Sequence, residues 1–181
     1  MARRPDGAQS DPWPGAPISS SDRFGQRTGE SMASDEHGAD GSQAVVEPRV
    51  RLLVYSDDRT TRAAVRTAIG RRPAPGLPRV EYVECATAYA VTREMDTGRI
   101  DLAIFDGEAT PTGGLGMCRQ MKDEIFHCPP VLVLTGRPQD AWLAVWSKAD
   151  GAVPHPLDPE LLAETAADLL RVRLASASSR V

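Results

Sequence analysis

Short apolar runs alternate with segments of helical periodicity along most of the chain, and this alternation limits the possible folds most strongly. The expected strands cover residues 50–55, 79–85, 100–105, 130–134 and 151–153. The expected helices cover residues 59–69, 88–95, 115–125, 139–148 and 158–172. Strands that are joined through helices pair in parallel, because each crossover returns the chain to the same end of the sheet. We therefore predict an α/β fold, a doubly wound five-stranded parallel sheet of order 2-1-3-4-5 with helices on both faces.

Composition divides the chain into three regions. Residues 1–48 are rich in Gly, Pro, Ser and Asp and are predicted to be a disordered N-terminal tail, because their few large apolar side chains cannot offset the entropy of ordering. Met32 lies inside this region and is an alternative translation start. Residues 49–173 are predicted to form the folded domain, and residues 174–181 a short C-terminal tail.

Charge and hydropathy exclude several classes of partner. The formal net charge is −4, so general affinity for nucleic acid or anionic lipid is not expected. No apolar run approaches the ~20 residues that a membrane-spanning helix needs, and no signal peptide is evident. We expect a cytoplasmic protein, peripheral to the membrane only through a partner. The three cysteines show no zinc-ligand spacing and are expected to be free thiols.

Polar residues follow three strands that are neighbours in the predicted order. Asp57 and Asp58 follow the first strand, Asp106 follows the third, and Thr135 ends the fourth. Carboxylates that meet at one edge repel each other unless a cation lies among them, and hard oxygen ligands suit Mg²⁺. A carboxylate such as that of Asp106 can also accept a phosphoryl group.

These residues and their spacing resemble the receiver domains of response regulators, the CheY-like proteins. Residues 53–58 match the acidic motif of the first strand, Asp106 the phospho-acceptor, and Gly114 a glycine that follows it. Thr135 matches the switch residue and Gly136 the small residue after it. His155–Pro156 stands where the family has Lys–Pro. The resemblance implies a flavodoxin-like fold and a signalling role rather than an enzyme. It also implies a Mg²⁺ site made by Asp57, Asp106 and the backbone carbonyl of Glu108, with Asp58 as a further candidate ligand.

Four positions depart from the family pattern. Ser56 replaces the first acid, His155 the lysine, and Ala152 the aromatic switch residue, while Pro111 lies one place later than usual. Histidine is often neutral at pH 7 and is then a poorer counter-ion than lysine. Alanine has no ring to move when the switch residue binds phosphate. We expect an atypical receiver, whose Mg²⁺ site is either retained or lost.

Each candidate residue also has a simpler interpretation. Asp106 is either the acceptor or a vestigial acid that caps a loop. Asp57 and Asp58 would also serve as an N-cap and a first-turn acid of the following helix. His155 would otherwise be a surface histidine in a loop.

Trp142 and Trp146 lie four residues apart on an expected helix. Such a stripe either packs on the sheet or stays exposed as an interface for a partner, since tryptophan is enriched at binding hot spots.

Two function hypotheses follow. Because only about eight residues follow Arg173, no DNA-binding output domain is expected, and output would come from binding a protein. The first hypothesis is a single-domain response regulator that a histidine kinase phosphorylates on Asp106. The second is a phosphorylation-independent adaptor. The runs 53–57, 105–114, 134–138 and 152–156 are similar to a group of actinobacterial orphan receivers associated with respiratory complex I, the NADH dehydrogenase. A flavodoxin is disfavoured, because Asp57–Asp58 occupies the position of its phosphate loop.

Overall fold

A computed structural model of the chain describes residues 47–178. Five parallel strands form one sheet in the order β2-β1-β3-β4-β5, which confirms the predicted topology. The strands are β1 (Arg49–Tyr55), β2 (Arg79–Cys85), β3 (Leu102–Asp106), β4 (Val131–Thr135) and β5 (Gly151–Pro154). The N-terminal region predicted to be disordered, with Met32, lies outside the described residues except for its last two positions.

The helices differ from the predicted ones mainly in the last third of the chain. They are α1 (Arg59–Ile69), α2 (Ala88–Asp96), α3 (Gly114–Glu124), α4 (Ala141–Trp146) and α5 (Pro159–Ser178). A 3-10 turn over Pro138–Asp140 precedes α4, so this helix is shorter than the expected 139–148. In contrast, α5 continues beyond the expected end at residue 172, into the region that composition assigns to a tail.

Local signals explain where the helices begin and end. The Asp58 carboxylate accepts a hydrogen bond from the backbone N–H of Thr60 and caps α1, as the simpler interpretation of this residue predicted. Gly70 ends α1 with a φ of 65°, a left-handed value that glycine adopts without strain. The Asp158 carboxylate likewise accepts from the N–H of Glu160 at the start of α5.

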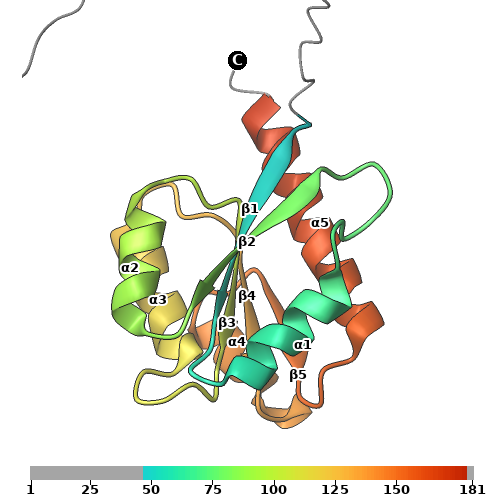
Figure 1. Cartoon of the computed structure of the whole chain (residues 1–181). Helices are drawn as coiled ribbons and strands as arrows, with labels where there is room; N and C mark the ends of the chain where they lie inside the picture. Colours follow the sequence, from blue (N-terminus) through green and yellow to red (C-terminus); the bar gives the residue numbers. More distant parts are fainter. Residues whose placement is uncertain (1–46, 179–181) are drawn as a thin grey trace, which may run out of the picture. The chain divides into compact units, whose positions relative to one another are not determined.

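Helices α1 and α5 cover one face of the sheet and α2 and α3 the other (Figure 1), and a separate apolar core lies on each face. On one face, Val65 and Ile69 of α1 and Leu162 of α5 pack against alternate residues of the central strands. On the other, Val91 of α2 and Met117 of α3 pack against the residues between them. The central strands are buried on both sides, so their polar groups concentrate at the strand ends.

The three cysteines are free thiols, as predicted. Cys85 and Cys118 are buried, and burial raises the pKa of each to about 11. Cys128 is half-buried, and burial raises its pKa as well. The thiols therefore serve as small apolar groups of the core.

Candidate functional site

Asp106 ends β3 and lies at the centre of a polar cluster at the carboxyl edge of the sheet. Its side chain is only 4 % exposed. The Ser56 hydroxyl donates a hydrogen bond of 2.7 Å to Oδ2, and the backbone N–H of Glu108 donates one of 3.0 Å to Oδ1. His155 Nε2 lies 3.8 Å from Oδ1. The buried carboxylate therefore has two fixed donors and one titratable neighbour.

Two glycines fix the backbone around Asp106. A Cβ on Gly114, the first residue of α3, would lie 2.4 Å from the carbonyl oxygen of Asp106. A Cβ on Gly107 would lie 2.6 Å from the carbonyl oxygen of Leu134, which also accepts a 2.8 Å hydrogen bond from the Gly107 N–H. No side chain fits in either place. The two close contacts hold Asp106 against α3 and β4.

Asp57 is bound by the loop that follows β3. The backbone N–H and the hydroxyl of Thr110 donate hydrogen bonds of 3.1 and 2.8 Å to its two carboxylate oxygens. These bonds hold the pKa of Asp57 below its usual value. The N–H of Thr60, with smaller contributions from neighbouring donors, likewise lowers the pKa of Asp58. Asp58 thus serves α1, whereas Asp57 joins the first strand to the loop beside Asp106.

Thr135 and His155 reach the same edge from β4 and β5. Thr135 is the last residue of β4 and is only 2 % exposed. The backbone N–H of His155 donates a 2.8 Å hydrogen bond to the Thr135 carbonyl, which extends the β4–β5 pairing by one step. His155 lies in the loop after β5 and is half-buried. The structure thus brings Asp57, Asp106, Thr135 and His155 to one edge of the sheet, as the strand order predicts.

Sequence reasoning missed three contributors to the cluster. Ser56 was recognised only as the replacement of an acid, not as a donor to Asp106. Neither the contact of Thr110 with Asp57 nor that of Tyr55 with the β3–α3 loop was predicted. The Tyr55 hydroxyl donates a 2.5 Å hydrogen bond to the carbonyl of Thr112, and burial, with the nearby charges of Asp57 and Asp106, raises the pKa of Tyr55. Only the path of the β3–α3 loop creates these contacts.

The donor chemistry of this edge suits Mg²⁺ in type. It offers the carboxylates of Asp57 and Asp106, which are hard oxygen ligands, and the third predicted ligand, the carbonyl of Glu108, belongs to the second residue after Asp106. Each of the four carboxylate oxygens already accepts a hydrogen bond from the protein. Ser56 supplies a donor where a further carboxylate would add negative charge. Between residues 47 and 178, no cluster of three or more His, Cys, Asp or Glu side chains is arranged to hold a metal.

The two tryptophans of α4 are exposed, which rules out the interpretation that they pack on the sheet. Trp142 is 64 % exposed, Trp146 is 51 % exposed, and Val145 beside them is 80 % exposed. The buried residue of α4 is Ala144. Arg119 of α3 donates a 2.8 Å hydrogen bond to the Trp146 carbonyl, and its guanidinium lies 5.9 Å from the ring centre. We call Trp142, Val145 and Trp146 the α4 apolar patch.

Comparisons with known proteins agree on one kind of molecule. No protein-family model matches the chain. Two curated relatives match at 60 % identity over 122 residues, which cover 67 % of this chain and 92 % of each relative. Both are described as an "uncharacterized response regulatory protein", and they come from two strains of Mycobacterium tuberculosis.

Solved structures with the same fold are receiver domains. The receiver domain of a Francisella response regulator aligns with a TM-score of 0.57 at 14 % identity, over 67 % of this chain and 97 % of that one. A CheY-like receiver domain from Methanospirillum hungatei gives 0.57 at 18 % identity, over 71 % and 99 % of the two chains. The receiver domain of a LuxO-type repressor from Vibrio parahaemolyticus gives 0.63 at 13 % identity, over 74 % and 99 %. At these identities the likeness supports the fold alone.

Among residues 47–178, no helix is both long enough and apolar enough to cross a bilayer.

Proposed function

Because this chain belongs to the response-regulator receiver family, we propose that it accepts a phosphoryl group on Asp106 and acts by binding another protein. The observation that carries the proposal is the setting of the Asp106 carboxylate. It is buried at the carboxyl end of β3, between the Ser56 hydroxyl and the His155 imidazole. Receiver domains are in general signal transducers rather than enzymes, and their partners include kinases.

The proposed step is transfer from the phosphohistidine of a histidine kinase. A carboxylate oxygen of Asp106 attacks phosphorus, and an O–P bond forms as the P–N bond breaks. The electron pair of the broken bond stays on the donor imidazole, which takes up a proton. His155, 3.8 Å from Oδ1, supplies positive charge to the phosphoryl oxygens when it is protonated. Thr135 ends the neighbouring strand and would donate its hydroxyl to the same oxygens.

Asp57, Asp106 and the carbonyl of Glu108 are the groups that would hold Mg²⁺. The ion, when bound, would offset the charge on the transferred phosphoryl group. The protein itself contributes by holding these ligands in position. Thr110 fixes the orientation of the Asp57 carboxylate, and the N–H of Glu108 fixes that of Asp106.

We place the output of the protein on the α4 apolar patch. Ala152 on the adjacent strand β5 has no aromatic ring to move, so signal output does not depend on a ring switch there. The patch is already exposed, and large aromatic side chains supply much of the energy of protein binding. Replacing Trp142 by alanine should therefore weaken partner binding more than it weakens the fold.

The decisive experiment is Mg²⁺-dependent phosphorylation of the purified protein by acetyl phosphate, followed by intact mass. We expect one phosphoryl adduct on the native chain and none on Asp106→Asn. The matched control is Asp168→Asn, an exposed acid of α5 that should leave the adduct unchanged. A folded native protein that gains no adduct would contradict the proposal.

A second candidate function is a phosphorylation-independent adaptor. The hydrogen bond from Ser56 to Asp106 favours it, because this bond satisfies the buried carboxylate without metal or phosphoryl group. No lysine or arginine nitrogen in the described part of the chain lies within 4.0 Å of Asp106. The concrete form of this function is a subunit docked on the cytoplasmic side of respiratory complex I. Its test is whether binding to that complex is the same for native protein and Asp106→Asn.

A further inference from the structure

The chain from α1 to the start of β2 is strongly basic. Residues 59–80 contain six arginines and no acidic residue, although the whole chain carries a net charge of −4. The arginines are Arg59, Arg62, Arg66, Arg71, Arg72 and Arg79. None of the basic residues is lysine, and arginine presents a planar fork that pairs with a carboxylate or phosphate through two hydrogen bonds. This composition concentrates anion-binding groups on one part of the domain.

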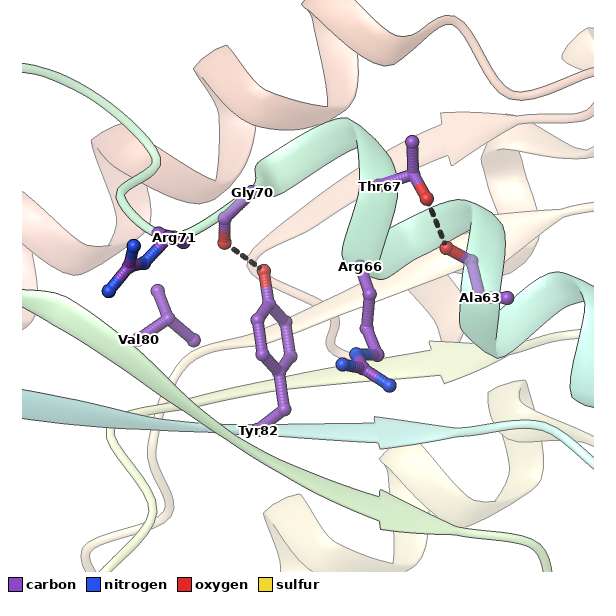
Figure 2. A pocket seen from close by; sticks show the side chains of 7 residues that line it. All are labelled: Ala63, Arg66, Thr67, Gly70, Arg71, Val80 and Tyr82. Carbon is purple, nitrogen blue, oxygen red and sulfur yellow. Dashed lines mark hydrogen bonds between the residues drawn. The ribbon is translucent and has the colours of Figure 1, made fainter.

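A groove of about 470 Å³ opens between α1 and β2 in this basic region. We call it the arginine groove. It is lined by Ala63, Arg66 and Thr67 of α1, by Gly70 and Arg71 directly after this helix, and by Val80 and Tyr82 of β2. Figure 2 shows the guanidinium groups of Arg66 and Arg71 on either side of Val80 and Tyr82.

Two contacts hold the floor of the groove together. The Tyr82 hydroxyl donates a 2.6 Å hydrogen bond to the carbonyl of Gly70, which ties β2 to the end of α1 (Figure 2). Burial raises the pKa of Tyr82 to about 12, so this donor keeps its proton at neutral pH. The guanidinium of Arg66 lies 5.5 Å from the centre of the Tyr82 ring, a favourable cation–π distance. A ligand would meet a surface that is already formed.

The outer edge of β2 borders the groove and is open. β2 is the terminal strand of the sheet. The Cys85 carbonyl accepts a hydrogen bond from the N–H of Ser56, so the peptide group of Cys85 faces β1. The N–H of Val80 instead donates to the Arg71 carbonyl, so the peptide group of Val80 faces away from the sheet. Peptide groups alternate along a strand, so those of Tyr82 and Glu84 point outward as well. No strand within residues 47–178 pairs with them.

The arginines around the groove already bind carboxylates. Glu47 places Oε2 2.7 Å from Nε of Arg79 and 3.6 Å from Nη2 of Arg72. Arg66 pairs with Glu84 at 2.8 Å. Arg71 differs, because its exposed guanidinium has no ion-pair partner within the described residues. The guanidinium of Arg71 is therefore available to bind an anion at the mouth of the groove.

We propose that the open edge of β2 and the arginine groove bind an extended acidic segment of a partner protein. The segment adds to β2 as a further strand and exchanges backbone hydrogen bonds with Tyr82 and Glu84. Its carboxylates pair with Arg71 and with Arg66 across the groove. The backbone bonds supply affinity for an extended chain, and the arginines select acidic side chains.

The observations favour a peptide over a nucleic acid or an anionic membrane. β2 itself carries Glu81 and Glu84, and Glu47 lies beside Arg79, so a continuous row of phosphates would meet negative charge. A flat lipid surface would leave the strand edge unpaired. Only an extended polypeptide matches both the backbone groups and the separated cations.

The test titrates the full-length protein with a fluorescein-labelled peptide of alternating threonine and glutamate. We expect saturable binding, and no binding of a peptide in which glutamine replaces each glutamate. Arg71→Gln should weaken binding roughly threefold, as for a partly exposed charge pair, and a double change with Arg66→Gln should weaken it roughly tenfold. The matched control is Arg93→Gln, an exposed arginine of α2, which should bind like the native protein.

Amide hydrogen exchange by NMR tests the strand addition itself. Bound peptide should slow the exchange of the Tyr82 and Glu84 amides, while the Val83 amide, which already faces β1, should change little. Binding without protection of Tyr82 and Glu84 would overturn strand addition. Failure of the peptide to bind, or tighter Arg71-dependent binding of oligothymidine or phosphatidylserine vesicles, would overturn the choice of an acidic polypeptide.

Discussion

The hydroxyl of Ser56 donates a 2.7 Å hydrogen bond to Oδ2 of Asp106, so a neutral side chain at the end of β1 satisfies the buried acid at the end of β3. In the receiver pattern, the first of these positions carries an acid that would repel its neighbour. Here the pair attracts. The substitution turns a like-charge contact, which needs a cation, into a contact that is stable by itself.

Ser56→Ala should lower the free energy of unfolding by about 1–3 kcal/mol, because it leaves a buried carboxylate oxygen without its donor. Chemical denaturation of the single variants and of Ser56→Ala with Asp106→Asn measures the coupling. We expect the serine change to cost less when Asp106 is already asparagine. Equal costs in both backgrounds would show that the hydrogen bond carries no coupling energy.

Gly114→Ala should destabilise the domain by about 1–3 kcal/mol, because its Cβ would lie against the Asp106 carbonyl and force α3 or β3 to move. The matched control is Gly116→Ala on the same helix. A Cβ there meets nothing within 4 Å, and this change should stabilise α3 by about 0.5–1 kcal/mol. Thermal unfolding of the two variants should therefore shift in opposite directions.

Thr110→Val should raise the pKa of Asp57 toward its ordinary value of 3.8, because the largest cause of its lowering is the Thr110 hydroxyl. NMR titration of the Asp57 carboxyl group checks this directly. Because the pKa of Asp57 is lower in the folded than in the unfolded protein, its carboxylate stabilises the fold fully at pH values above the unfolded-state pKa. This stabilisation is lost as the pH falls through the folded-state pKa. The difference in stability between native protein and variant should therefore vanish at pH values well below 3.8.

Trp142→Ala should change the free energy of unfolding by less than about 0.5 kcal/mol, as expected for a side chain that is largely exposed. Denaturant unfolding measures this. Leu143→Ala on the same helix, a residue less exposed than either tryptophan, should cost more. A loss of several kcal/mol for Trp142→Ala would mean that the ring belongs to the core.

Cys85 and Cys118 should resist alkylation by iodoacetamide at pH 8, since burial excludes the reagent and raises both thiol pKa values to about 11. Mass spectrometry after a timed reaction counts the modified thiols. All three cysteines should react once the protein is unfolded in denaturant. Rapid labelling of Cys85 in the native protein would show that β2 opens readily.

The regular part of the fold could be predicted because its signals are local. The bounds of α1 match the sequence prediction, since Asp58 and Gly70 mark its two ends. For Trp142 and Trp146 the sequence left packing on the sheet and exposure both open, because aromatic rings four residues apart fit either a buried stripe or an interface. The residue of α4 that is buried is the small Ala144, whose spacing carries no comparable signal.

The candidate site was predictable in outline and not in detail. Strand order alone brings Asp57, Asp106 and Thr135 to one edge of the sheet. The contacts of Thr110 with Asp57 and of Thr112 with Tyr55 join residues more than fifty positions apart. They depend on the path of a loop, and loop paths follow from packing rather than from a repeating pattern.

The register of β1 and β2 has a consequence for assembly. Val80, in the arginine groove, pairs with Val50 at the start of β1, whereas Cys85 pairs with Tyr55 beside the Asp106 edge. Five residues of strand separate the two levels, which is about 16 Å. We therefore expect a ligand held at the Val80 end of the strand pair to leave the Asp106 edge accessible. In that case the domain would link two binding partners in one complex.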